Sequence, residues 1–218
     1  MDMDSRVKDL LYRMNVTKGS RFNASKRLEG RDRRMALLIA LASAVVIALT
    51  FMSTAYRLPP AVVSDLNVVT MVASVLILAV SLIQYSNDDA VNAEQHHRCG
   101  LEINELRGQL QTIQQSISEE NLSEFARRYS HILDKYSVNH DLVDYDRYRL
   151  DHPDVFKLSL IEKLFIHLRS LTQTQWPNLL MAIIAVAAIF LVFWYVVPAR
   201  LTADGRSSPP ATSTQRTN

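Results

Sequence analysis

The stretch Met35–Tyr56, MALLIALASAVVIALTFMSTAY, holds 22 residues without a single charge. Nine residues further on, Leu66–Asn87, LNVVTMVASVLILAVSLIQYSN, is a second uncharged run of 22 residues. As a helix, each run would be about 33 Å long, enough to cross the ~30 Å hydrocarbon core of a bilayer. Within lipid, only a helix of this kind pairs all of its own backbone groups. The two runs therefore predict a transmembrane helical hairpin over residues 35–87, with spans at 35–56 and 66–87.

The residues around the two runs predict how the hairpin turns and how it is oriented. The link holds Pro59 and Pro60, which end one helix, followed by Ser64 or Asp65, which can cap the next. Residues 1–34 carry ten Lys or Arg, whereas the link carries only Arg57. By the positive-inside rule, the basic N-terminal segment 1–34 and residues 88–170 lie in the cytoplasm. We expect a multi-pass membrane protein.

The composition supports an all-α membrane protein. The 218 residues are 48% hydrophobic, yet the mean hydropathy is +0.00, as expected when apolar runs are separated by strongly polar segments. Only five glycines are present, and no stretch alternates in the manner of a β-strand. A single cysteine excludes an intrachain disulfide and fits a reducing cytoplasm.

Residues 4–14 show the spacing of a short amphipathic helix. Its apolar residues are Val7, Leu10, Leu11 and Met14. This face could dock on the protein's own helices or lie along the lipid interface, and docking is the favoured interpretation. We expect Gly19 and Ser20 to end this helix, and the helix of the first span to begin between residues 20 and 25.

A regular seam of residues follows the second span. Its members are His96, Cys99, Ile103, Leu106, Leu110, Ile113 and Ile117. Their 3,4 spacing is typical of a coiled coil three heptads long, so we expect an unbroken helix of about 50 residues from Leu66, bent at most at Gly100 or Gly108. The seam predicts a cytoplasmic helical stalk over residues 88–170 and assembly into a homo-oligomer.

Two further helices are expected in the stalk. Residues 118–121 form a turn and a cap, and the helix after them, ending near Ser137, can fold back on the seam. Residues 139–141 break that helix, and Pro153 begins another. The apolar face of this last helix is Val155, Leu158, Ile161, Phe165 and Leu168. Residues 88–170 hold 15 acidic and ten basic residues, which argues against direct, sequence-specific nucleic-acid binding.

A third apolar run, Leu179–Val197, has 19 residues and no charge. Trp176 precedes it and Trp194 and Tyr195 close it, as in the aromatic belts of membrane helices. We therefore expect a third transmembrane helix at 177–198. Residues 199–218 have the composition of a disordered tail.

Polar residues inside the first two spans are the best candidates for a functional site. They are Ser43, Thr50, Thr54, Thr70, Ser74, Ser81 and Gln84. Stripes of this kind either pack helices closely or line water. No charge lies inside any span, which argues against a proton relay or a coupled transporter and leaves a passive pore built from several hairpins.

Catalysis and metal binding have little support. His96 and Cys99 share a helix face, but a structural zinc site needs four ligands and a catalytic site needs three, so a polar layer that sets the register of the seam is favoured. An enzyme that uses these residues or His140 would have to hold a metal stoichiometrically. For the aspartates around His140, helix caps and a solvated acidic face are the favoured interpretation. The sequence has no nucleophile elbow and no glycine-rich phosphate loop. We expect no enzyme activity, no cofactor and no metal.

Three blocks of sequence resemble the SLATT family of bacterial conflict-system membrane proteins. They are ASKRLEGRDRR at residues 24–34, EQHHRCGLEINELRGQL at residues 94–110 and YSHILDKYSVNHDLVDYDRYRL at residues 129–150. With the hairpin they cover residues 20–150. The family is usually described with two spans, so the third apolar run departs from that description.

The resemblance implies a multi-pass effector of anti-phage defence in a bacterial inner membrane, as in abortive infection. It would be controlled by a sensor of the same system, namely a nucleotide-second-messenger synthase, a SLOG-type sensor or a reverse transcriptase. On activation it would oligomerise and permeabilise the lipid bilayer by forming a pore. The alternative is a membrane scaffold that recruits a partner through its cytoplasmic helices and conducts nothing.

Overall fold

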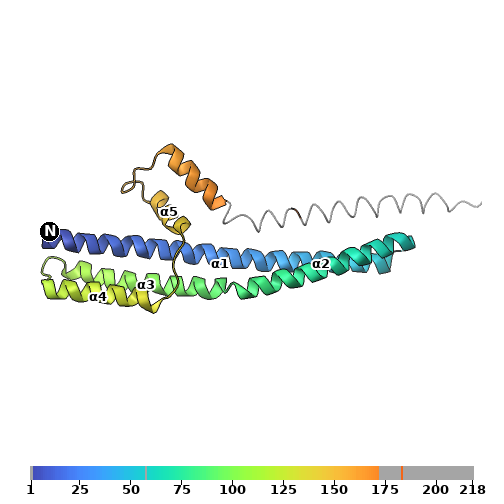
Figure 1. Cartoon of the computed structure of the whole chain (residues 1–218), viewed down its shortest axis with the longest axis horizontal. Coiled ribbons are helices and arrows are strands. Elements are labelled where there is room, and N and C mark those ends of the chain that lie inside the picture. The colour runs from blue at the N-terminus through green and yellow to red at the C-terminus, as the bar shows by residue number, and fades with distance from the viewer. Residues whose placement is uncertain (1, 57, 172–182, 184–218) are drawn as a thin grey trace, which may run out of the picture. The chain divides into compact units, whose positions relative to one another are not determined.

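The computed structural model describes residues 2–56, 58–171 and residue 183, and every regular element in these residues is a helix (Figure 1). The elements are α1 (Met3–Ala55), α2 (Pro60–Ser86), α3 (Asp89–Ile113), α4 (Glu119–Lys135) and α5 (Leu142–Asp151), and residues 160–171 are also helical. The prediction of an all-α protein is confirmed for this part of the chain. Apart from Ile183, the expected helix at 177–198 and the tail at 199–218 lie outside the described residues.

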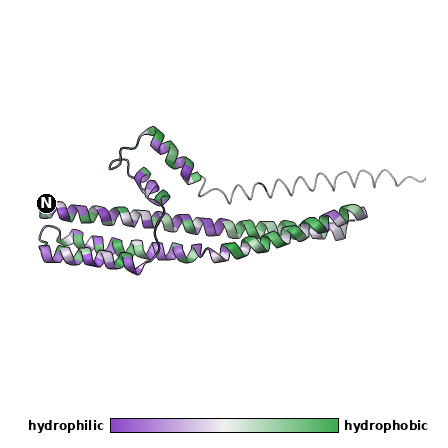
Figure 2. Cartoon of the chain, viewed as in Figure 1, coloured by the Kyte–Doolittle hydropathy of each residue, from purple (hydrophilic) through white to green (hydrophobic). Residues whose placement is uncertain are grey.

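The chain divides into two compact units. One, here called the polar unit, contains Met1–Ala36 and Gln84–Pro177. The other, here called the apolar unit, contains Leu37–Ile83 and Asn178–Asn218, of which residues 37–56, 58–83 and 183 are described. Figure 2 shows hydrophobic residues gathered in the second half of α1 and in α2, while α3, α4 and the first half of α1 are mostly hydrophilic.

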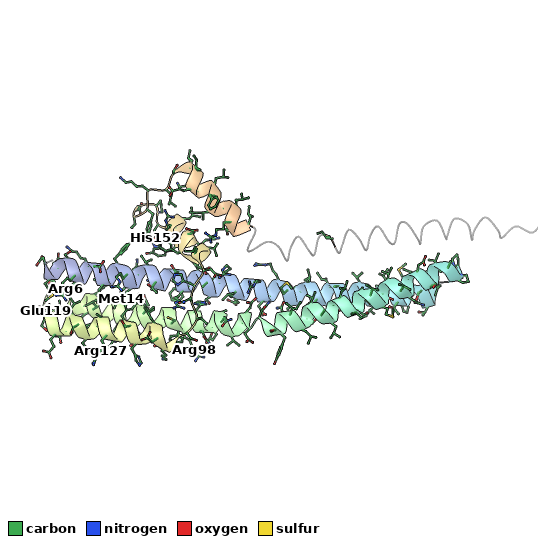
Figure 3. All side chains as sticks on the ribbon, in the orientation of Figure 1. Arg6, Met14, Arg98, Glu119, Arg127 and His152 are labelled. Carbon is green, nitrogen blue, oxygen red and sulfur yellow. The ribbon has the colours of Figure 1, made fainter. Side chains whose placement is uncertain are left out.

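One hydrophobic core joins three helices of the polar unit. Its buried members, from α1, α3, α4 and the residue after α4, are Val7, Leu10, Met14, Cys99, Ile103, Leu106, Leu110, Leu122, Phe125, Tyr129 and Tyr136. The docking interpretation of residues 4–14 is therefore confirmed, because Val7, Leu10 and Met14 contact the chain's own helices. An ion pair between Arg6 of α1 and Glu119 of α4 closes the end of this bundle (Figure 3).

The predicted break at Gly19 and Ser20 is wrong, because α1 runs through both residues without interruption for 53 residues. A Cβ atom at Gly19 would overlap the ring of Tyr148, and Ser20 is fully buried. These two small residues therefore serve close packing. The isolated sequence does not reveal this use, because the ring that occupies the space comes from α5.

The predicted unbroken helix from Leu66 is also wrong. The chain leaves α2 at Ser86 and starts α3 at Asp89, and Asp88 between them has the left-handed values φ 50° and ψ 30°. A left-handed residue cannot continue a right-handed helix. Gly100 lies within α3, and its missing side chain makes room for Phe22, whose Cε1 would lie 2.8 Å from a Cβ atom there.

The prediction that the next helix folds back on the seam is confirmed, since Leu122, Phe125 and Tyr129 of α4 share the core with α3. The backbone N–H of Asn121 donates to Oγ of Ser118 at 3.2 Å, which caps α4 as expected. The helix ends at Lys135, two residues before the expected Ser137.

The last predicted helix begins at residue 160 instead of Pro153. Residues 153–159 form turns and an irregular segment, in which Phe156 packs edge-on against Tyr148. Val155, Ile161, Phe165 and Leu168 are exposed, so the expected apolar face has no partner within the described chain. Ile166 is the buried residue of this helix.

In the apolar unit, few side chains are buried. They are Leu38, Ala42 and Leu49 of α1 and Leu66 and Thr70 of α2. Most of the other large apolar side chains are exposed, including Phe51 at 67% and Met71 at 65%. Both helices are long and apolar enough to cross a membrane. An unburied apolar surface of this extent is expected when lipid or other membrane helices cover it.

Candidate functional site

The seven residues of the predicted seam all point into the polar unit. Five are buried, namely His96, Cys99, Ile103, Leu106 and Leu110, while Ile113 and Ile117 pack at the edge of the same core. The seam is thus filled by α1 and α4 of its own chain. Its role in assembly of several chains stays a prediction, and in this conformation the five buried residues have no free surface for it.

A buried cation lies beside the polar start of the seam. Arg21 of α1 is only 3% exposed, and its Nη1 lies 3.2 Å from Nδ1 of His96. The same Nη1 donates to the carbonyl oxygen of Val138, in the segment between α4 and α5. Burial and the nearby Arg21 charge lower the pKa of His96 to about 4, so His96 is neutral at pH 7. This polar layer therefore ties α1 to α3 and to the segment before α5.

A second arginine of α1 holds α5. The Nε atom of Arg27 donates to Oδ1 of Asp144 at 2.8 Å, and its Nη2 donates to Oδ2 at 2.9 Å. Nη2 also reaches Oδ2 of Asp141 at 2.7 Å. Burial opposes the charge on Arg27, but hydrogen bonds and attraction from the two carboxylates outweigh it and raise its pKa. Asp144 is 1% exposed, so this is a buried, bidentate ion pair.

A third arginine, one helical turn further on, holds the start of α3. The Nε atom of Arg31 donates to Oδ2 of Asp89 at 2.6 Å, and Nη2 binds the other carboxylate oxygen. Asp89 is the first residue of α3 and is 5% exposed. We call Arg21, Arg27 and Arg31, with their partners His96, Asp144 and Asp89, the arginine clamp.

The arginine clamp was not among the predictions. The basic residues ahead of the first span predict only the orientation of the hairpin, and the aspartates after residue 140 predict caps and a solvated acidic face. The capping interpretation holds, since the Asp141 N–H donates to Oδ2 of Asp144 at 3.1 Å. The solvated interpretation is wrong for Asp144. The available signal was the i, i+4 spacing of Arg27 and Arg31, which places two cations on one face of α1.

The structure does not show the polar residues of the spans around a lumen. Six hydroxyls each donate to a carbonyl three or four residues earlier in their own helix, at 2.7–3.1 Å. They belong to Ser43, Thr50, Thr54, Thr70, Ser74 and Ser81. Thr70 is buried, whereas Thr50, Thr54 and Ser74 are exposed and Ser43 and Ser81 are half-buried.

Gln84 belongs to the polar unit and contacts α1. Its Nε2 donates to the carbonyl oxygen of Asp32 at 3.1 Å and to Oδ1 of the same residue at 2.8 Å. The lining of a pore by Gln84 and the six hydroxyl residues stays a prediction. Among the described residues, no group of three or more His, Cys, Asp or Glu side chains is placed to hold a metal ion.

These features define a class of protein. Two helices are suited to a membrane, and a helical polar unit with a buried ionic clamp accompanies them. The chain therefore has the features of a helical membrane protein that also folds a polar helical unit.

A comparison with family models identifies the family. Residues 3–198 match the SMODS and SLOG-associating 2TM effector domain family 5, and the chain belongs to this family. The resemblance to SLATT proteins is thereby confirmed, and the family name links the chain to SMODS and SLOG partner domains. The match includes the third apolar run at 179–197. Comparisons with curated proteins and with solved structures gave no match.

Proposed function

We propose that the protein is an oligomeric inner-membrane effector of an anti-phage defence system, which permeabilises the membrane when a partner sensor activates it. Residues 35–56 and 66–87 form its transmembrane hairpin, residues 177–198 its third span, and residues 1–34 and 88–170 its cytoplasmic part. The membership in an effector family with two membrane helices supports the general role.

The continuity of α1 is the observation that carries the mechanism. One uninterrupted helix contributes Val7 and Met14 to the polar core, bears the three arginines of the clamp, and continues into the first apolar run. A rotation of α1 in the cytoplasm therefore reaches the membrane through a continuous hydrogen-bond ladder. We propose that the arginine clamp holds the resting state, and that a sensor releases it.

In the proposed mechanism, the helices of the apolar unit form the pore. One chain with three spans is too small to enclose a channel, so several copies must assemble. The exposed apolar side chains of α1 and α2 offer the surface for that assembly. Because each span hydroxyl is bonded within its own helix, these residues can remain in dry contacts at rest and accept water when the helices rotate.

Leakage of liposomes tests the lining of the pore. The triple variant Thr70→Leu, Ser74→Leu and Ser81→Leu should abolish ion leakage and leave insertion intact. The matched control replaces Val68, Val72 and Val75 by Leu on the same helix, which introduces three leucines at exposed apolar positions and removes no hydroxyl. Equal leakage from both triple variants would refute the lining assignment.

The mass of the oligomer, measured in the same detergent, completes this experiment. A leaking oligomer supports the effector proposal. An oligomer that causes no leakage would mean that the activating signal is missing. The variant Asp144→Asn should imitate this signal, because it weakens the ion pair with Arg27. A silent monomer that stays silent in this variant supports the alternative function.

That alternative is a scaffold without conduction, and one observation favours it. Residues 160–171 expose a continuous apolar stripe on the polar unit, including Leu160 at 84% and Ile161 at 79%. A partner protein could cover this stripe. A scaffold would retain its partner when the span hydroxyls are replaced by Leu and would never make liposomes leak.

A further inference from the structure

A small cationic pocket lies on the polar unit, between α1, α5 and the helix of residues 160–171. Its volume is about 270 Å³, and Lys26, Arg27, Arg34 and Arg147 line it together with two carboxylates. Four cationic side chains around one small cavity repel one another unless an anion neutralises them. The composition of the lining therefore points to an anionic ligand.

The ion pairs of the polar unit show which of these cations are free for a ligand. Arg27 is occupied by Asp144 and Asp141. Within the described part of the chain, Lys26, Arg34 and Arg147 have no carboxylate within ion-pair distance. Their charges exceed the single remaining carboxylate of the lining, that of Asp151. The pocket thus keeps an excess of two positive charges.

Arg34 supplies the most specific sign of a missing partner. Its Nε and Nη2 atoms are buried and lack any hydrogen-bond acceptor in the described structure. The guanidinium folds back along α1, and its Nη1 would lie 3.2 Å from a Cβ atom at Gly30, so the absence of a side chain there makes room for it. Buried donors of this kind are nearly always satisfied in native proteins, by protein, water or a ligand. A tetrahedral oxyanion suits the fork of a guanidinium.

The size and the position of the pocket limit which anions could bind there. At 270 Å³ it lies just below the ~300–1,000 Å³ of sites that enclose drug-sized molecules. It suits a single phosphate group with a small substituent. Arg34 immediately precedes the first apolar run at Met35, so the phosphate of an anionic lipid headgroup and a soluble phosphate ester are both available sources.

We infer that Lys26, Arg34 and Arg147 form a phosphate-binding site that joins α1 to α5. Arg34 binds the phosphate oxygens with its buried nitrogens, and Arg147 and Lys26 approach from the exposed side. The bound anion replaces the missing acceptor of Arg34 and reduces the repulsion among the three cations. This inference does not depend on the formation of a pore.

Thermal unfolding of the full chain in maltoside micelles, which contain no phosphate, tests the site. Inorganic phosphate is titrated in one arm and dihexanoyl phosphatidylglycerol in the other, against chloride at equal ionic strength. A ligand that binds only the folded chain raises its melting temperature with concentration, and the dependence gives Kd. The variants are Arg34→Gln and Arg147→Gln. Arg33→Gln is the matched control, because Arg33 is exposed on the same helix and does not line the pocket.

We expect both pocket variants to weaken binding about tenfold or more, as for the loss of a hydrogen bond to a charged group, and the control to bind like the original chain. Stabilisation by phosphate alone identifies a soluble ligand, and stabilisation by the lipid alone identifies a headgroup; either result supports the site. Because Arg147 is exposed, its variant should fold even if that of Arg34 does not. The inference is overturned if neither probe stabilises the chain, if Arg147→Gln binds unchanged, or if Arg33→Gln binds as weakly as the pocket variants.

Discussion

Replacement of Asp144 by Ala should open the polar unit, and Cys99 provides the means to measure this. Asp144 is 1% exposed and accepts two hydrogen bonds from Arg27 and one from the backbone of Asp141. Its removal leaves the Arg27 guanidinium, whose side chain is only 13% exposed, with the partly solvated Asp141 carboxylate as its remaining ion-pair partner. Removing one partner of a buried ion pair typically costs about 3–5 kcal/mol.

The effect should reach Cys99 through a chain of contacts. Asp144 holds α5, the segment before α5 provides the Val138 carbonyl that binds Arg21, and Arg21 contacts His96, one turn before Cys99. Cys99 is the only cysteine and is 0% exposed, so a maleimide labels it only when the core opens. A loss of 3–5 kcal/mol corresponds to roughly two to nearly four orders of magnitude in the opening equilibrium. The labelling rate should rise by up to that factor.

Two controls make this result decisive. Asp134→Ala removes an exposed carboxylate of α4 and should leave the labelling rate unchanged. The double variant Arg27→Met with Asp144→Leu replaces the buried pair by apolar side chains, and it should label more slowly than Asp144→Ala, since no charge is left buried alone. If Asp144→Ala and Asp134→Ala label at the same rate, the clamp does not hold the core closed and the reasoning fails.

Three other substitutions test the packing of α1, the buried histidine and the break before α3. Gly19→Ala should destabilise the chain by about 1–3 kcal/mol in thermal unfolding, because the added methyl overlaps Tyr148, whereas Gly108→Ala, with open space around it, should stabilise α3 by up to about 1 kcal/mol. The pKa of His96 is lowered from 6.5 to about 4, so the unfolded chain binds a proton at His96 before the folded chain does as the pH falls. The free energy of unfolding should therefore decrease between pH 6.5 and 4, by up to about 1.4 kcal/mol per pH unit. The variant His96→Gln should reduce this slope in unfolding experiments. Asp88→Gly should be tolerated at φ 50°, whereas Asp88→Val should cost about 1–2 kcal/mol in the same assay, and equal stability of the two would contradict the left-handed break.

Much of the fold could be predicted from local sequence patterns. The apolar positions of α3 and α4 repeat at helical spacing, and this periodicity predicted both the buried seam and the return of α4. The Ser118 cap was equally predictable, because it involves only the next three residues. These features depend on interactions close along the chain, or on one helix face that must be covered.

The errors have a common origin in distant partners. Gly19 looks like a helix terminator until the ring of Tyr148 is placed against it, 129 positions away in the sequence. Asp144 looks like a solvated carboxylate until Arg27 covers it. The sequence specifies residue types at such places, whereas the choice between a turn and a packing site, or between solvent and a buried ion pair, depends on the tertiary structure.

The helices of the two apolar runs continue differently within the polar unit, and this difference bears on activation. α1 is unbroken from the polar core into the first apolar run, whereas α2 ends at Ser86 and the chain passes through the left-handed Asp88 before α3 begins. A residue outside the helical ladder can absorb a change of backbone angle, while a continuous ladder transmits it. The break at Asp88 argues for α1, rather than for α2 and α3, as the path of the signal, and the three clamp arginines all lie on α1.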